Sequence, residues 1–388
     1  MTNIIVVGVN LSGLMAGSQR VNNLFKPLLQ KGSLQLCNLI VNESIAVESS
    51  NGIIVKKFKY KLKNPFSILY YLYNSLLYSF KQYNNNRLNI IYHYGYPSIE
   101  NILLLKISKL IGYKIIFDIV EIVKYFDQSK SSGRKRFKNF TSRLLLNQLY
   151  KTGSLCFAIS TNLVTFCKTI CKNRIPVIHL PISVDVEFVN SFRMKSIDGN
   201  NTKIKIFYGG SFGLKDGINF LLKGFELACE YNSEIELILT GKISKQIDGI
   251  IQMLISESKW VNRINYMGCL SISKYFETMV NSDILCMTRV NTIYANAGFP
   301  FKLGEYLASG NAIIATDVGD VSKYLENGQN AIIIKPDSEF AICDAILMLC
   351  QNKDLRSKVG ISGKKTAIKY FSVELVSTIL WENISRLN

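Results

Sequence analysis

The sequence predicts an α/β protein of two domains, each built on a parallel β-sheet covered by helices. Three observations point to this fold class. The 388 residues exceed what one hydrophobic core usually organises. Short apolar runs alternate with amphipathic stretches, which is typical of parallel sheets. A polar passage rich in Gly and Asn, residues 191–203, lies near the middle of the chain and marks a domain boundary.

The expected strands and helices follow the hydrophobic pattern. Strands are predicted at residues 4–7, 34–41, 89–93, 114–117, 204–208, 234–239, 283–287 and 312–315. Apolar residues at helical spacing predict a helix that starts at about Ile218. We expect residues 1–190 and 200–370 to form the two domains, and residues 371–388 a helix that is a candidate to cross back to the first. Two such domains facing each other would hold a ligand in the cleft at the carboxyl ends of their strands.

Composition excludes several classes of protein. Apolar residues make up 48% and charged residues 19%, which excludes disorder. The opening residues resemble a first strand and not a signal peptide, and the uncharged run 64–80 is too polar for a convincing membrane span. The nine cysteines form no Cys-x-x-Cys pair, and only His93 and His179 could join them around a metal, so no metal site is expected. The same scattered cysteines lead us to expect a reducing cytoplasm.

The net positive charge of +18 lies entirely in the first half of the chain. Residues 1–180 hold 24 Lys and Arg against 6 Asp and Glu, whereas residues 181–388 hold 22 of each. This asymmetry favours a positive face directed at a polyanion, such as an anionic lipid, a phosphorylated lipid carrier or nucleic acid. A basic surface that only keeps the protein soluble is the alternative.

Two segments of the first half carry much of this charge. The alternating lysines of residues 56–63 precede the Tyr- and Leu-rich stretch 66–80, a combination that suits a seat on anionic lipid. The alternative is an edge strand protected by lysines. A second basic cluster, residues 129–139, could bind a lipid-linked pyrophosphate.

Three loops between a strand and a helix are candidate ligand sites. The first, residues 8–20, could bring backbone N–H groups to a phosphate or a sugar, although a tight turn also explains it; its candidate residues are Gly13, Gly17, Ser18 and Arg20. The second, residues 207–217, could hold a diphosphate, with Lys215 supplying the balancing charge. The third, residues 298–319, carries Lys302 and Glu305; Glu305 could accept hydrogen bonds from a ribose diol or be a first-turn acid facing water.

The second and third loops together resemble glycosyltransferase family 4, the group 1 glycosyltransferases. There, a Gly-rich loop ending in a lysine precedes a Glu-x7-Glu segment, here followed by Ala308-Ser309-Gly310 and by residues 314–319. Weaker similarity extends to residues 159–163 and 181–185. The resemblance implies the GT-B fold, two facing Rossmann-like domains with a cleft between them, and a retaining hexosyltransferase that needs no metal or other cofactor.

The resemblance also implies roles for individual residues. Gly209, Gly210 and Lys215 would bind the donor diphosphate and Glu305 the ribose, while Gly268 would frame the base. The backbone of Phe299, Pro300, Phe301 and Lys302 would face the transferred sugar. Lysine would neutralise the leaving diphosphate in place of a metal.

The sequence departs from the family at three places. Ser211 stands where an arginine is usual, Ala297 stands where the first glutamate is usual, and the His-Asp pair of many relatives is replaced by Phe117-Asp118. Arg289 is a candidate for the missing charge, although a surface arginine is the commoner case. Asp118 or Glu121 could hold the acceptor hydroxyl or take its proton; a helix-capping Asp118 and a solvated Glu121 are equally consistent with the sequence.

The sequence therefore predicts a glycosyltransferase that moves a sugar from UDP- or GDP-sugar to a lipid-linked or membrane-associated glycan. The setting implied by the resemblance is bacterial surface-polysaccharide synthesis (capsule, O-antigen or exopolysaccharide), on the cytoplasmic face of the membrane. The alternatives are a sugar-nucleotide 2-epimerase on the same fold and a basic nucleic-acid-binding protein, although the sequence has no recognisable nucleic-acid-binding motif.

Overall fold

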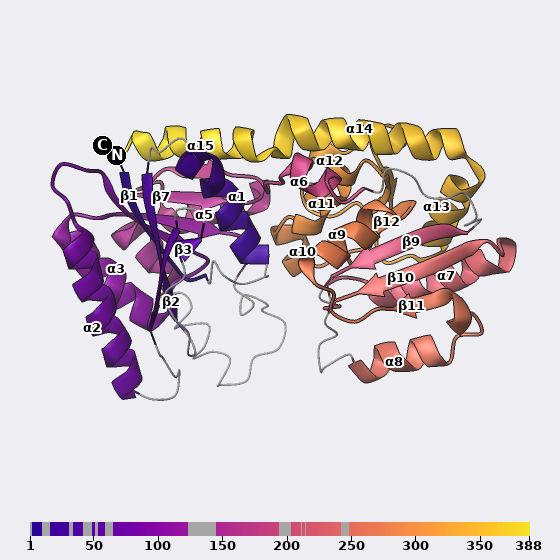
Figure 1. The fold of residues 1–388 in the computed structure, drawn as a ribbon, viewed down its shortest axis with the longest axis horizontal. Helices are drawn as coiled ribbons and strands as arrows, with labels where there is room; N and C mark the ends of the chain where they lie inside the picture. Colours follow the sequence, from indigo (N-terminus) through magenta and orange to yellow (C-terminus); the bar gives the residue numbers. More distant parts are fainter. Residues whose placement is uncertain are drawn as a thin grey trace. The chain divides into compact units, whose positions relative to one another are not determined.

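The chain forms two compact α/β units in a computed structural model. The structure describes residues 2–9, 16–30, 34–41, 49–50, 53–58, 65–122, 145–193, 203–210, 212–213, 215–241 and 248–388. The first unit comprises Met1–Pro181 and Val373–Asn388, and the second comprises Ile182–Ser372 (Figure 1). Each unit contains a mainly parallel sheet with helices packed on it, as the alternating apolar pattern predicts.

The first unit is built on a sheet whose described strands follow the order β3-β4-β2-β1-β5-β6-β7-β8. Only β3 runs antiparallel to its neighbour among these strands. The strands are β1 (Thr2–Val7), β2 (Leu34–Val41), β3 (Ser49–Ser50), β4 (Ile53–Phe58), β5 (Asn89–Tyr94), β6 (Lys114–Ile119), β7 (Leu155–Ala158) and β8 (Val177–His179). The helices include α1 (Ala16–Gln30), α2 (Pro65–Gln82), α3 (Ile99–Ile111), α5 (Thr161–Cys171) and α15 (Val373–Ser385).

The second unit is built on a parallel sheet of the order β11-β10-β9-β12-β13-β14. Its strands are β9 (Ile204–Gly209), β10 (Ile235–Thr240), β11 (Ile264–Tyr266), β12 (Ile284–Met287), β13 (Ala312–Thr316) and β14 (Ile332–Ile334). Its helices are α6 (Val186–Asn190), α7 (Ile218–Tyr231), α8 (Asp248–Ser256), the 3-10 turn η2 (Val261–Arg263), α9 (Ile272–Val280), α10 (Ile293–Ala297), α11 (Phe301–Ser309), α12 (Val321–Tyr324), α13 (Glu339–Gln351) and α14 (Lys353–Phe371).

This strand order is that of a doubly wound sheet, and it fixes where a ligand can bind. Within the second sheet, β9 and β12 are neighbours in space but not in sequence, so the loops that leave their carboxyl ends diverge to opposite faces. In the first sheet the same reversal falls between β1 and β5. Ligands of open α/β sheets bind at such a switch point.

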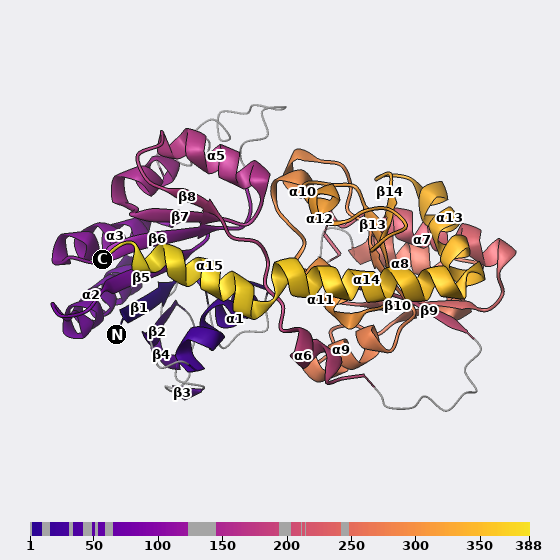
Figure 2. The same ribbon diagram turned by 90° about the horizontal axis from the view of Figure 1, so that it is seen from above.

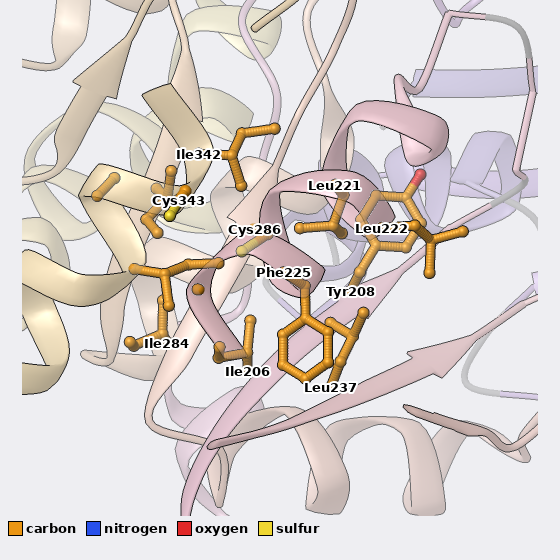
Figure 3. Packing of buried hydrophobic residues seen from close by; sticks show 14 of the residues in the cluster. Ile206, Tyr208, Leu221, Leu222, Phe225, Leu237, Ile284, Cys286, Ile342 and Cys343 are labelled. Carbon is orange, nitrogen blue, oxygen red and sulfur yellow. The ribbon is translucent and has the colours of Figure 1, made fainter. Parts of the chain in front are cut away.

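The apolar positions predicted for the helix after β9 form the core of the second unit. Leu221, Leu222 and Phe225 of α7 pack onto Ile206 and Tyr208 of β9 (Figure 3). In the first unit, α15 packs on α1, with Val376, Leu380 and Ile384 buried in the core (Figure 2). The division between the units falls at Pro181, earlier than the polar passage 191–203, because α6 packs on α9 and α11.

Candidate functional site

The loops after β9, β10 and β11 of the second unit are tied together by their backbones. Gly210 donates its N–H to Thr240 O at 2.9 Å, and Gly241 donates its N–H to Gly268 O at 2.9 Å. Gly241 has φ +134°, and a β-carbon there would collide with Gly210 O, so only glycine fits this contact. Gly268, with φ +62°, has no atom within 4 Å of the place of a β-carbon. The Gly-rich loops therefore form a close-packed rim at the strand ends, open beside Gly268.

Lys302 of α11 lies against the first of these loops. Its ammonium lies over the Tyr208 ring at 4.0 Å from the centroid, and 3.8 Å from the carboxylate of Asp216. A β-carbon on Gly210 would overlap Lys302 Nζ, so the ammonium keeps this place only beside a glycine. Burial lowers the pKa of Lys302 to about 8; Arg289 and Lys215 act in the same direction, whereas Asp216 and Glu305 oppose it.

Asp216 organises the segment between β9 and α7. It is 3% exposed, and its Oδ2 accepts the Gly213 N–H at 2.9 Å. The neighbouring Lys215 places its ammonium 4.8 Å from the centroid of the Tyr294 ring. Asp216 was not among the residues predicted from the sequence, because an aspartate before a helix is a common capping residue. Ser211 lies outside the described residues.

Glu305 projects from the middle of α11, so the prediction of a first-turn acid is wrong; no acid occupies the first turn of this helix. Its Oε2 accepts a hydrogen bond from Tyr275 OH at 3.0 Å. Burial raises the pKa of Glu305 to about 7, more than the Tyr275 hydrogen bond and Lys302 lower it. The carboxyl group of Glu305 therefore gains or loses its proton near neutral pH.

The side chains of the segment before α11 pack within the second unit. The Phe299 side chain is 3% exposed and packs on Tyr324 and Phe371, and Pro300 is the N-cap of α11. Ala297 is buried at the end of α10. Arg289, by contrast, is only 8% exposed, so the prediction of a surface arginine is wrong.

The candidate residues of the first unit meet at the carboxyl ends of β1, β5 and β6. Gly17 packs against the Tyr94 ring, which leaves no room for a larger residue, and Gly95 donates its N–H to Asp118 O at 2.8 Å. Ser18 is buried, Glu121 is exposed, and Gly13 lies outside the described residues, as do residues 129–139.

Arg20 and Asp118 form a buried ion pair. Arg20 Nε donates to Asp118 Oδ2 at 2.7 Å and Nη2 donates to Oδ1 at 2.8 Å, while Nη1 donates to Pro181 O at 2.7 Å. Both side chains are inaccessible to solvent. Burial opposes the charge, but Asp118 outweighs it and raises the pKa of Arg20. Asp118 lies within β6, so the helix-cap prediction is wrong, and this geometry favours a positioning role for the pair.

His93 of β5 is buried and held neutral. Its Nδ1–H donates to Gly95 O at 3.1 Å, and its Nε2 accepts from Asn101 Nδ2 at 3.1 Å. Burial lowers its pKa to about 4. From the sequence, His93 had no expected role beyond that of a possible metal ligand, and these contacts assign it to the framework of the first unit.

Helix α2 has an unusual distribution of apolar side chains. Ser75 and Ser79 are fully buried, whereas the exposed side carries large apolar residues at helical spacing: Phe66, Leu69, Tyr70, Tyr73, Leu77 and Phe80. The adjacent α3 exposes Leu103, Ile107 and Leu110. We call these nine side chains the apolar face of α2 and α3. No helix within the described ranges has both the length and the apolar character needed to span a membrane.

Comparisons with known proteins place these features in a class. Across nearly their whole length, the chain and two solved structures share the same fold. For sucrose-phosphate synthase of Thermosynechococcus elongatus the TM-score is 0.77 at 12% identity, with 100% of this chain and 99% of that chain covered. For HepE of Anabaena in complex with UDP-glucose it is 0.73 at 14% identity, with 100% of both covered. The fold is that of the GT-B glycosyltransferases.

The sequence comparisons point to one group of glycosyltransferases for the second unit. Residues 203–352 match the family described as "Glycosyl transferases group 1". The phosphatidyl-myo-inositol mannosyltransferase of Mycobacterium leprae is 20% identical over 193 residues, which are 50% of this chain and 49% of that protein. The alignment thus spans about half the length of this curated relative. The similarity to the group 1 glycosyltransferase family model thus lies in the second unit of the chain.

Proposed function

We propose that the protein is a retaining glycosyltransferase that takes a hexose from UDP- or GDP-sugar and passes it to a lipid-linked or membrane-associated glycan. The observation that carries the proposal is the group of cations at the switch point of the second sheet, where Lys215 and Lys302 flank the Gly-rich loop after β9. The match of this unit to group 1 glycosyltransferases and the UDP-glucose bound by HepE support it.

The chemistry of the second unit suits a leaving diphosphate. When the bond between the anomeric carbon and the diphosphate breaks, negative charge grows on the phosphate oxygens, and fixed cations in a partly buried site stabilise that charge. In this proposal Lys302 and Lys215 are the fixed cations, and no metal ion is needed. Glu305 would bind the ribose, and the strand-end backbone at Gly268 would lie beside the base.

Retention fits a site without a strong protein base. The acceptor hydroxyl approaches from the side that the diphosphate leaves, its oxygen bonds to the anomeric carbon, and its proton passes to a departing phosphate oxygen. Both oxygens of Asp118 accept hydrogen bonds from Arg20. In this proposal the pair therefore holds α1 and β6 of the first unit together, and Asp118 does not take the proton. Glu121, an exposed residue two positions after β6, is the remaining candidate to hold the acceptor hydroxyl.

Donor transfer is tested by incubating purified protein with UDP- and GDP-sugars and a membrane lipid extract. Sugar should enter the lipid fraction, and Lys215→Ala and Glu305→Ala should weaken donor binding. The matched control is Lys259→Ala, because Lys259 pairs with Glu230 on the surface of the same unit. If no sugar moves and the two site variants bind donors as the wild type does, the proposal fails.

The acceptor side is proposed to be an anionic membrane surface on the cytoplasmic face, as in the assembly of a surface polysaccharide. The apolar face of α2 and α3 supports this, because exposed lysines lie on the same two helices: Lys81, Lys106 and Lys109. Large apolar residues beside lysines suit the boundary between lipid headgroups and acyl chains.

Vesicle sedimentation tests the membrane surface. The wild type should sediment with anionic vesicles and less with zwitterionic ones, and Phe66→Glu with Tyr73→Glu should abolish sedimentation. Phe340→Glu, at an exposed apolar residue of α13 in the second unit, is the matched control. Retention of the double variant on anionic vesicles, or salt-dependent binding to DNA instead, would refute this assignment.

A further inference from the structure

Arg289 lies two residues after the end of β12 and flanks the switch point of the second sheet. Since β9 and β12 are neighbours, the carboxyl end of β9 with Gly210 lies on one side of the reversal and the residue after Thr288 on the other. A ligand bound at this switch point is therefore within the reach of both loops. For the diphosphate itself, the family resemblance implies Gly209, Gly210 and Lys215, all at or after the carboxyl end of β9.

The backbone around Arg289 is fixed to the segment that carries Lys215. Thr288 Oγ1 donates to Asp216 O at 3.1 Å, and Val290 donates its N–H to Lys215 O at 3.1 Å. The carbonyl of Arg289 itself accepts from Thr316 Oγ1 at 2.8 Å. The position of Arg289 relative to the loop after β9 is thus set on both sides of the residue.

The guanidinium is buried but poorly paired. Nε has no hydrogen-bond partner among the described residues, and Nη1 makes only a long contact of 3.5 Å with Ala295 O. The charge is in electrostatic contact with Asp216, Tyr208 and Tyr294, and burial lowers its pKa despite them. A buried cation without full pairing is costly, so it needs a reason to be there.

The local charge is unbalanced in favour of an anion. Lys215, Arg289 and Lys302 lie near two described carboxylates, Asp216 and Glu305, and Asp216 already accepts the Gly213 N–H. The pKa of Glu305 is raised to about 7, so these two acids do not balance the three cations and an excess of positive charge is left. A diphosphate, with negative charge on both of its phosphates, complements this excess.

We propose that Arg289 binds the donor diphosphate from the β12 side, opposite the Gly210 backbone and Lys215. This inference rests on the proposed function and adds a specific residue to it. The planar guanidinium offers paired donors to phosphate oxygens, and the incoming anion satisfies the Nε–H that the protein leaves unpaired. It also accounts for how the chain neutralises a diphosphate with Ser211, and not an arginine, in the loop after β9.

Calorimetric titration tests the inference with UDP, GDP, uridine, guanosine and inorganic pyrophosphate as probes. Arg289→Gln should weaken the binding of the preferred nucleoside diphosphate and of pyrophosphate about tenfold to a hundredfold, and leave the nucleoside unchanged. Arg289→Lys, which keeps the charge, should recover part of the loss. Arg356→Gln is the matched control, because Arg356 is a partly buried arginine of the same unit that donates to Leu349 O.

The outcomes separate this inference from the proposed function. Equal diphosphate affinity in Arg289→Gln and the wild type, with sugar transfer intact, overturns the inference and leaves the function standing. Equal loss for nucleoside and diphosphate assigns Arg289 to the fold and also overturns it. Binding of pyrophosphate that depends on Arg289, without binding of any nucleotide, supports the anion site and refutes the nucleotide donor. If Arg289→Gln does not fold, Arg289→Lys carries the same comparison.

Discussion

The ammonium of Lys302 occupies the space that a side chain on Gly210 would need. Gly210→Ala should therefore push Lys302 away from the loop after β9. Because Lys302 Nζ is the end of a flexible side chain, the fold should persist with a small loss of stability. Donor affinity should fall about tenfold, since a charged contact to the phosphate is lost. Calorimetry with the preferred nucleoside diphosphate and thermal unfolding measure the two effects.

Gly249→Ala is the matched control for this substitution. Gly249 lies in α8, and a β-carbon there would meet nothing within 4 Å. Alanine favours a helix over glycine by up to about 1 kcal/mol, so this variant should be slightly more stable and bind donor normally. Normal donor binding by Gly210→Ala would contradict the role given to the Lys302 contact.

Lys302 should make donor binding depend on pH. Its pKa is lowered to about 8 in the folded protein, so the free site loses this charge as pH rises through that value. Donor affinity should fall between roughly pH 7 and pH 9, and Lys302→Met should bind weakly with this dependence removed. Calorimetric titration at a series of pH values measures it. The same steep fall in Lys302→Met would assign the titration to another group.

Glu305 should make the stability of the protein depend on pH between about 4.5 and 7. Its pKa is raised from 4.5 to about 7, so between these values the folded protein holds a proton that the unfolded chain has lost. The free energy of unfolding should therefore decrease as pH rises through this window. Glu305→Gln should flatten the dependence, measured by denaturant unfolding at several pH values. An unchanged slope in Glu305→Gln would contradict the raised pKa.

The Arg20–Asp118 pair should matter for stability before it matters for chemistry. Asp118→Asn leaves a buried guanidinium without its counter-ion, and breaking a buried pair costs about 3–5 kcal/mol. Urea unfolding of Asp118→Asn should show this loss, whereas Glu121→Gln, at an exposed position after β6, should be within about 0.5 kcal/mol of the wild type. A fully stable Asp118→Asn that transfers no sugar would instead assign Asp118 a direct chemical role.

The sequence predicted the framework well because buried parallel strands are continuous apolar runs. The expected strands at 34–41, 89–93 and 312–315 match β2, β5 and β13 to within a residue, and the helix from Ile218 is α7. The Gly-rich loop and the segment with Glu305 could be located because glycine contacts and helix starts leave local patterns. The polar passage 191–203 marked the boundary less accurately, because packing of α6 on α9 and α11 decides it.

The missed features depend on contacts between residues far apart in sequence. Nothing local indicates that Arg20 reaches Asp118 across 98 positions, or that Arg289 is buried beside Asp216. The exposed apolar residues of α2 have the same helical spacing that a buried face would have. Only the burial of Ser75 and Ser79 on the other side of the helix shows that this apolar face is the exposed one. Pattern predicts elements, whereas the topology of the sheet decides which loops share a site.

The most direct measurement of the central claim is calorimetric titration of UDP and GDP into the protein in EDTA. If Lys302 and its neighbouring cations take the place of a metal, one of the two nucleotides should bind in EDTA as tightly as with magnesium, and Lys302→Met should bind it about tenfold more weakly. Binding that requires magnesium, or that is the same in Lys302→Met and the wild type, would contradict the account.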